Sequence, residues 1–338
     1  MRPWDDSLRR FLVLSACAIL VAAGWLLVGT PAACAQTVVR LGGLFPTTHF
    51  EGQGQVKLAE IIGQKTGGKL KVEVFPASQL GSETEQTEQV RSGALQFHSS
   101  GGSIQQYVPE LQIIGLPGLW KSHDHVLHVV QSDVGKQLIE MAEKKQVGIK
   151  VLTFVTMGER YYLGRKRPVE QTAEFAGVKI RVDTQPASAA IWRAVHANPV
   201  PMAFSEVYSA LQTGVIDAAE QPPCGIVSMK FYEQAKYVTT TAHQLTLMAL
   251  QVNQKWYDGL PADIRGQINA SVQEWLPIRY QMAKDAEAAC MANLKSSGAE
   301  IHALKDQEAF RAALVPLQKE FGDKYNLNDL IAKIKAIN

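Results

Sequence analysis

Regular alternation between strand-like and helix-like segments is the feature that most constrains the fold of this chain. Residues 38–44 are mostly apolar and predict a strand, residues 53–65 carry apolar side chains at helical spacing, and residues 69–75 alternate apolar and charged side chains. Gly67 and Gly68 separate the helix from the second strand, as glycines often do at helix ends. This β-α-β order predicts an α/β fold with largely parallel sheets.

A second segment repeats this order later in the chain. Gly93 and Gly214 each end a predicted helix and lead directly into a short apolar strand. The likeness is either a chance similarity of two short segments or a sign of two lobes with similar topology. In the second case both lobes present the carboxyl ends of their strands to one cleft, where open α/β sheets bind ligands. The side chains expected at the two lips are Ser99 and Ser100 on one side and Glu220 and Gln221 on the other.

The amino terminus has the layout of a signal peptide. Arg9 and Arg10 precede an uncharged apolar run at residues 11–28, and a small-residue cleavage motif ends at Ala35. We expect export to the periplasm with cleavage after Ala35, so that residues 1–35 are removed and the mature chain begins at Gln36. An uncleaved membrane anchor is the alternative, because 18 apolar residues can just span a bilayer.

Composition limits the possible partners and cofactors. The chain has 34 Lys and Arg against 32 Asp and Glu, so its net charge of +2 is too small for nucleic-acid binding. Cys224 and Cys290 remain after the leader is removed, and one disulfide is possible but not required. His123, Asp124, His125 and His128 resemble a metal cluster, but Ser122 could equally cap an exposed helix there, and we expect no metal and no cofactor.

An unusual arginine lies in a strand in the middle of the chain. In residues 177–182 the apolar side chains share one face, so Lys179 and Arg181 lie on the other. The last third is helical, with a long helix that begins at Pro261 and is expected to kink at Pro277.

Several strings together resemble the DctP-type substrate-binding proteins of tripartite ATP-independent periplasmic (TRAP) transporters. They are GVKIRV at 177–182, ANPVPMAFSEVY at 197–208 and ALQTGVID at 210–217, with GGKLKVEVFP at 67–76 and FYE at 231–233 in support. The resemblance implies a two-lobed periplasmic binding protein fold. Each lobe would be a mostly parallel sheet flanked by helices, with crossing strands and a long C-terminal connecting helix. We place lobe I at residues 36–157 plus 247–286 and lobe II at residues 158–246 plus 287–338.

The same resemblance assigns the ligand contacts. It gives Arg181 a paired salt bridge to the ligand's carboxylate, which a planar guanidinium suits better than an ammonium. Arg160 fits a second family arginine in a Gly-x-Arg pattern. The competing interpretations are that Arg181 neutralises Asp183 and that Arg160 pairs with Glu159. By position, the pocket should also contain Phe204 and Thr184.

Two departures from the family pattern bear on specificity. Gln221 stands where the family usually has an asparagine that touches the ligand, and its longer side chain leaves less space. Asp183 replaces a frequent proline, and its carboxylate could weaken anion binding or contact a hydroxyl of the ligand.

The resemblance predicts a receptor that binds a small organic carboxylate and delivers it to a TRAP membrane permease. Arg181 and Arg160 would hold the anion from one lobe, with Ser99, Ser100 and His49 on the other, and the lobes would close by hinge motion. A sensor protein with the same ligand site is the first alternative. A periplasmic enzyme is the second, with Cys224 and His243 as the candidate nucleophile and base, but the common catalytic motifs are absent from the sequence.

Overall fold

The computed structural model describes residues 36–338. The predicted signal peptide, its cleavage site and the anchor alternative lie outside the described residues. Contacts group residues 38–338 into one compact unit. No helix in the described part of the chain combines the length and apolar character needed to cross a bilayer.

A five-stranded sheet holds the amino-terminal strands. Its order is β2-β1-β3-β10-β4. The strands are β1 (Thr37–Gly42), β2 (Leu70–Phe75), β3 (Phe97–Ser100), β4 (Ile149–Glu159) and β10 (Leu245–Asn253). β1 and β3 are parallel, whereas β10 runs antiparallel to both β3 and β4. The sheet is therefore mixed.

A six-stranded sheet holds the middle of the chain, in the order β11-β9-β5-β8-β6-β7. Its strands are β5 (Tyr161–Gly164), β6 (Lys179–Val182), β7 (Asn198–Pro201), β8 (Ala218–Gln221), β9 (Tyr237–Thr239) and β11 (Glu300–His302). β6 is parallel to β7 and β8, and β9 is parallel to β11, but β5 is antiparallel to its neighbours. Largely parallel sheets were expected. Both are mixed because the chain passes directly from one sheet to the other through β4, β5 and β10.

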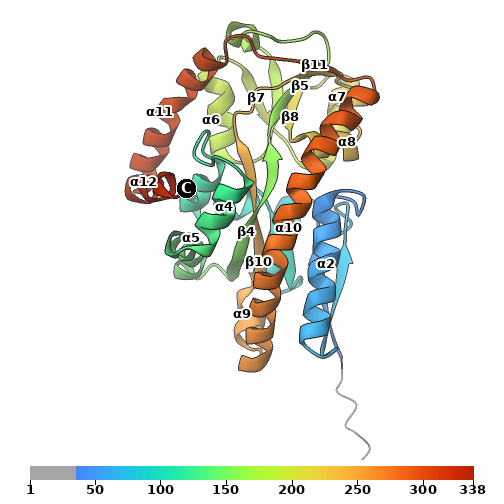
Figure 1. The fold of residues 1–338 in the computed structure, drawn as a ribbon, viewed down its shortest axis with the longest axis vertical. Helices are drawn as coiled ribbons and strands as arrows, with labels where there is room; N and C mark the ends of the chain where they lie inside the picture. The colour runs from blue at the N-terminus through green and yellow to red at the C-terminus, as the bar shows by residue number, and fades with distance from the viewer. Residues whose placement is uncertain (1–35) are drawn as a thin grey trace, which may run out of the picture. The chain divides into compact units, whose positions relative to one another are not determined.

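Two crossing points join the sheets. Only Arg160 separates β4 from β5, and only residues 240–244 separate β9 from β10. Figure 1 shows β4 and β10 running together through the middle of the described unit. The expected crossing strands are therefore present, and the cavity described below is lined partly by the residues that cross.

Helices cover both sheets. The α-helices are α2 (Phe50–Lys65), α3 (Glu83–Ser92), α4 (His123–Gln131), α5 (Asp133–Lys145), α6 (Pro186–Ala194), α7 (Val207–Thr213), α8 (Pro223–Ser228), α9 (Gln254–Asp258), α10 (Ala262–Ser296), α11 (Gln307–Tyr325) and α12 (Asn328–Ala336). Short 3-10 helices are η1 (Ser103–Gln106), η2 (Pro109–Gly115), η3 (Thr172–Phe175), η4 (Phe204–Glu206) and η5 (Phe231–Glu233).

The long connecting helix is α10. It continues through Pro277, and it packs against α2 and β4 beside the first sheet and against α8 beside the second (Figure 1). A disulfide between Cys224 and Cys290 ties α8 to it. The lobe boundaries stay a prediction, and α12, which the sequence assigns to lobe II, contacts α5 of predicted lobe I.

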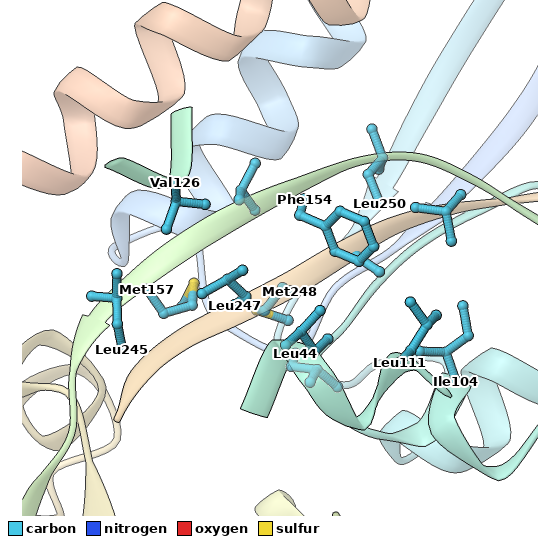
Figure 2. Close-up of a cluster of buried hydrophobic side chains, with 14 of the residues drawn as sticks. Leu44, Ile104, Leu111, Val126, Phe154, Met157, Leu245, Leu247, Met248 and Leu250 are labelled. Atoms are coloured by element: carbon cyan, nitrogen blue, oxygen red, sulfur yellow. The ribbon is translucent and has the colours of Figure 1, made fainter. Parts of the chain in front are cut away.

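The largest apolar core is built where β4 and β10 pair. Figure 2 shows Phe154, Leu247 and Leu250 from these strands among apolar side chains from η1, η2 and α4. Leu44, Met157 and Met248 belong to the same cluster and also reach the cavity. A rigid, closely packed core therefore supports one wall of the candidate site.

Candidate ligand-binding site

A cavity of about 40 Å³ lies between the segments that flank the two sheets. The residues that line it come from the first sheet and its loops, from the crossing strands and from the second sheet. They are Leu44, Phe45, Glu83, Gly101, Met157, Arg160, Arg181, Asp183, Gln185, Phe204, Gln221, Thr246 and Met248. The rings of Phe45 and Phe204 meet across it with centroids 5.1 Å apart. The cavity is thus apolar on one wall and charged on another.

Arg181 is one of two buried cations that line this cavity. It lies on β6, where apolar neighbours on either side hold the strand in the sheet, and its side chain is only 3% exposed. Its Nε and Nη2 donate to the carbonyl oxygen of Met202 at 3.0 and 2.7 Å, and the guanidinium lies 5.9 Å from the Phe204 ring centre. Burial lowers the pKa of Arg181 to about 10, although nearby Asp183 opposes this shift. Among the described residues, Arg181 forms no ion pair with a carboxylate.

Arg160 is neutralised within the protein. Its Nη2 lies 3.2 Å from Oε1 of Glu220 and donates to the Glu220 carbonyl oxygen at 3.1 Å, while its Nη1 donates to Thr246 at 3.3 Å. Its Nε has no hydrogen-bond partner. Burial alone raises the pKa of Glu220, but Arg160 and His243 outweigh it and lower the value to about 2. Arg160 therefore pairs with Glu220 on β8 and not with Glu159, the internal partner that the sequence had offered.

Two carboxylates share the cavity with the arginines. Glu83, at the start of α3, accepts hydrogen bonds from the backbone N–H groups of Gly102 and Ser103 and from the Ser100 hydroxyl, at 2.7, 2.9 and 2.9 Å. Burial opposes its ionisation, but these donors together lower the pKa of Glu83. Burial raises the pKa of Asp183, against the opposing effect of Arg160. The cavity thus offers carboxyl oxygens as acceptors beside one unpaired guanidinium.

The structure brings only part of the expected set into the cavity. Arg181, Arg160, Phe204 and Gln221 line it. Glu220 is buried behind Arg160 as its counter-ion. The ligand contacts themselves remain predictions for these residues.

The other expected contacts lie elsewhere. Thr184 is exposed, and Ser99 is buried without lining the cavity. The Ser100 hydroxyl is engaged by Glu83. His49 caps α2, accepts a hydrogen bond from the Glu51 N–H at its Nδ1, and lines a neighbouring cavity beside the disulfide. Burial, with a smaller effect of Arg279, lowers the pKa of His49 to about 3, so its ring is neutral.

Sequence reasoning missed Glu83 and Gln185. Glu83 stands one residue after the N-cap Ser82, where the helix dipole already explains an acidic residue. Gln185 precedes Pro186 at the start of α6 and carries no chemical signature in the sequence. A short loop after β3 brings Gly101 and Glu83 together, which no local pattern reveals.

The candidate metal and catalytic residues have separate structural roles. His123 contacts the Thr156 hydroxyl, His125 the carbonyl of Ile334 and His128 the carbonyl of Asn338. Within residues 36–338, no three or more His, Cys, Asp or Glu side chains lie together so that they could hold a metal ion. Cys224 is held in the disulfide, the option that the sequence left open.

Comparison with known proteins gives the family. Residues 41–324 match the model of the bacterial extracellular solute-binding proteins, family 7. The C4-dicarboxylate-binding periplasmic protein DctP of Rhodobacter capsulatus is 30% identical over 92% of this chain and 94% of its own length. The 2,3-diketo-L-gulonate-binding periplasmic protein YiaO of Escherichia coli is 29% identical over 87% and 89%.

Solved structures agree in fold. A TRAP periplasmic solute-binding protein from a Polaromonas species, bound to D-erythronate, superposes with a TM-score of 0.85 at 28% identity, covering 90% of this chain and 99% of that one. One from Roseobacter denitrificans with bound β-D-glucuronate gives 0.84 at 27%, covering 89% and 100%. The two-lobed α/β fold expected from the sequence is therefore confirmed. The chain belongs to the family-7 bacterial extracellular solute-binding proteins of TRAP transporters, a family of periplasmic receptors for small molecules, and it is a binding protein and not an enzyme.

Proposed function

We propose that this protein captures a small hydroxylated monocarboxylate, such as a sugar acid, and delivers it to a TRAP membrane permease. The observation that carries the proposal is the pairing pattern of the two cavity arginines. Arg160 already has an internal carboxylate partner, whereas Arg181 has only a carbonyl oxygen. A buried guanidinium without a counter-ion favours an anion, and a carboxylate matches its donors.

The acids of the cavity argue for hydroxyl groups on the rest of the ligand. Glu83 and Asp183 present carboxyl oxygens, and Gln185 and Gln221 present amides. Hydroxyl groups donate well to such acceptors, and a hydrogen bond to a charged group contributes about 1.5–3 kcal/mol. A second ligand carboxylate would face the ionised Glu83 and be repelled. We therefore favour a hydroxylated monocarboxylate over a dicarboxylate.

The ligands of solved relatives support this class. Relatives at 25–28% identity hold D-erythronate, β-D-glucuronate or D-galacturonate, all of which carry one carboxylate and several hydroxyl groups. The printed names of curated relatives are more varied and include a C4-dicarboxylate-binding and a sialic acid-binding protein. Delivery to a permease, a periplasmic location with cleavage after Ala35, and closure of two lobes by hinge motion are parts of the same proposal.

A ligand panel tests the proposed class directly. Thermal-shift screening followed by calorimetry would use D-erythronate, D-glucuronate, D-galacturonate and succinate on the mature protein, because a ligand that binds only the folded state raises the melting temperature. We expect one of the three hydroxy acids to bind at least about tenfold more tightly than succinate. Tighter binding of succinate would refute the proposed class.

The Glu83→Gln variant examines the reason for that preference. Removing the negative charge should improve succinate binding relative to the hydroxy acids by about tenfold, because a like charge no longer faces the second carboxylate. Glu88→Gln is the matched control: Glu88 is on the same helix but in a surface ion pair with Arg91. An unchanged ratio in Glu83→Gln would remove Glu83 from the selectivity argument.

A further inference from the structure

Gln185 links the cavity to both sheets. It directly follows the loop after β6 of the second sheet, lines the cavity and is only 3% exposed. In this buried position its side-chain amide has an NH₂ donor and an oxygen acceptor that both need hydrogen-bond partners. Each has a different partner: Asp183 follows β6 of the second sheet, and Gln105 lies on η1 after β3 of the first.

On the second-sheet side, Gln185 holds Asp183. The Gln185 backbone N–H donates to Oδ1 of Asp183 at 3.0 Å, and its side-chain Nε2 donates to Oδ2 at 3.2 Å. Both carboxyl oxygens of Asp183 are thereby engaged. Asp183 is two residues from Arg181 in the same cavity and would otherwise be the nearest anion to pair with it.

On the first-sheet side, Gln185 reaches Gln105. The Nε2 of Gln105, on η1 after β3, donates to Oε1 of Gln185 at 2.9 Å. Beside this contact the Ala187 N–H donates to Oε1 of Gln112 on η2 at 3.2 Å. Both hydrogen bonds join segments of the two sheets, and both are buried.

Two glycines leave the space that the Gln185 side chain occupies. A Cβ at Gly102 would overlap with Cγ of Gln185, and a Cβ at Gly115 would overlap with its Oε1. Both glycines belong to the first-sheet side, next to η1 and in η2. The absence of side chains at Gly102 and Gly115 therefore leaves a depression next to the first sheet, and the Gln185 side chain fills it.

We propose that Gln185 is a positioning residue that couples anion capture to closure. It holds Asp183 away from Arg181, so that Arg181 stays available for the ligand. It also joins the segment after β6 to the segment after β3 through the hydrogen bond from Gln105, which we call the latch. The ligand part of this inference rests on the proposed function. A residue that does both explains why a carboxylate next to the anion-binding arginine is compatible with anion binding.

Three variants separate the two roles. Gln185→Met keeps the side-chain length but removes both side-chain contacts, whereas Gln105→Met removes only the latch. Gln89→Met is the matched control, because its Nε2 makes one hydrogen bond to the Leu80 carbonyl oxygen within the first-sheet side. Affinity, association and dissociation rates are measured with the tightest binder among D-erythronate, D-glucuronate and D-galacturonate.

The expected results differ in size and in kinetics. Gln105→Met should weaken binding by about three- to tenfold through faster dissociation, as expected for one lost hydrogen bond. Gln185→Met should lose about tenfold or more. Adding Asp183→Asn to Gln185→Met should restore part of the loss, because a neutral amide cannot neutralise Arg181, and adding it to Gln105→Met should restore nothing. Affinities for both variants within twofold of the Gln89→Met control, or no rescue by Asp183→Asn, would overturn the proposal.

A distance measurement tests the hydrogen bond between Gln105 and Gln185 without any ligand. The test therefore still applies if none of the acids binds and the proposed function is wrong. Spin labels at Val56 on α2 and Val215 before β8, which are 37% and 58% exposed, report the separation of the two sides. We expect Gln185→Met and Gln105→Met to reduce the population at short distance relative to wild type and Gln89→Met. Identical distance distributions in all four proteins, with and without the acids, contradict the latch.

Discussion

At the scale of single residues, the two arginines of the cavity differ in how their charge is compensated. Arg160 is charge-compensated by Glu220, and Arg181 is bound only by a carbonyl oxygen. Coulomb attraction between the carboxylate of a ligand and a buried guanidinium is strong because little water screens it. The uncompensated residue should therefore carry more of the binding energy.

Replacing Arg181 by Lys tests this directly. An ammonium cannot reproduce two parallel hydrogen bonds to a carboxylate, so we expect at least about tenfold weaker ligand binding in calorimetry. Arg167→Lys is the control, since Arg167 lies on the surface in an ion pair with Glu174. Equal affinities in the two variants would exclude Arg181 from the site.

At the scale of elements, the strand ends were predicted less well than the strands themselves. The strand expected directly after Gly93 begins only at Phe97 as β3, and the strand expected directly after Gly214 begins only at Ala218 as β8. In both places the glycine at the end of the helix, Gly93 or Gly214, adopts a left-handed conformation, and a turn follows before the strand. Leu95 and Ile216 in these turns are buried without joining the sheet, and periodicity alone cannot distinguish such residues from strand residues.

Glu159, the last residue of β4, makes stability depend on pH. Burial, with a smaller effect of Glu287, raises its pKa from 4.5 to about 7. Between these values the folded protein keeps a proton that the unfolded chain has lost, so this residue makes stability fall as pH rises from 4.5 to about 7. Glu159→Gln should flatten that fall and stabilise the protein at pH 8 by on the order of 1–3 kcal/mol. Urea unfolding at several pH values measures it, with exposed Glu320→Gln as control. A wild-type pH profile in Glu159→Gln would refute it.

The disulfide between α8 and α10 should matter for stability. It closes a loop with a sequence separation of 66 residues, and removing such a bond typically costs about 2–5 kcal/mol. Replacing both Cys224 and Cys290 by Ser should therefore lower the free energy of unfolding by that amount in urea titrations under oxidising conditions. Ser228→Ala, on α8 but outside the disulfide, should change it by less than about 1 kcal/mol. A loss no larger than that of the control would mean that helix packing alone holds α8.

At the scale of the whole molecule, two mixed sheets share crossing strands and one long helix. Because β4 continues into β5 through Arg160, a residue of the crossing segment itself lines the cavity. Any change in the relative position of the sheets must then change the geometry of the cavity.

Export is the whole-molecule property that can be checked most simply. When the full chain is expressed with its leader, the mature protein recovered from the periplasm should begin at Gln36, because signal peptidase cuts after a small-residue motif such as that ending at Ala35. Intact-mass measurement and amino-terminal sequencing identify the first residue. Protein that retains Met1 in the membrane fraction would instead support an uncleaved anchor.

Local sequence patterns alone predicted an α/β fold, the long helix after Pro261 and the strand that carries Arg181, whereas the two-lobed architecture came from the family resemblance. Those features depend on periodicity and on residues close in the chain, which a sequence displays directly. Tertiary structure decided the charge pairing of the cavity: Glu220 forms an ion pair with Arg160, and Glu83 lines the same cavity. Arg160 and Glu220 are 60 residues apart in the chain, and Glu83 is farther still from Arg160. A charge pairs with whatever packing brings within a few ångströms, so only the folded chain reveals which arginine is left for the ligand.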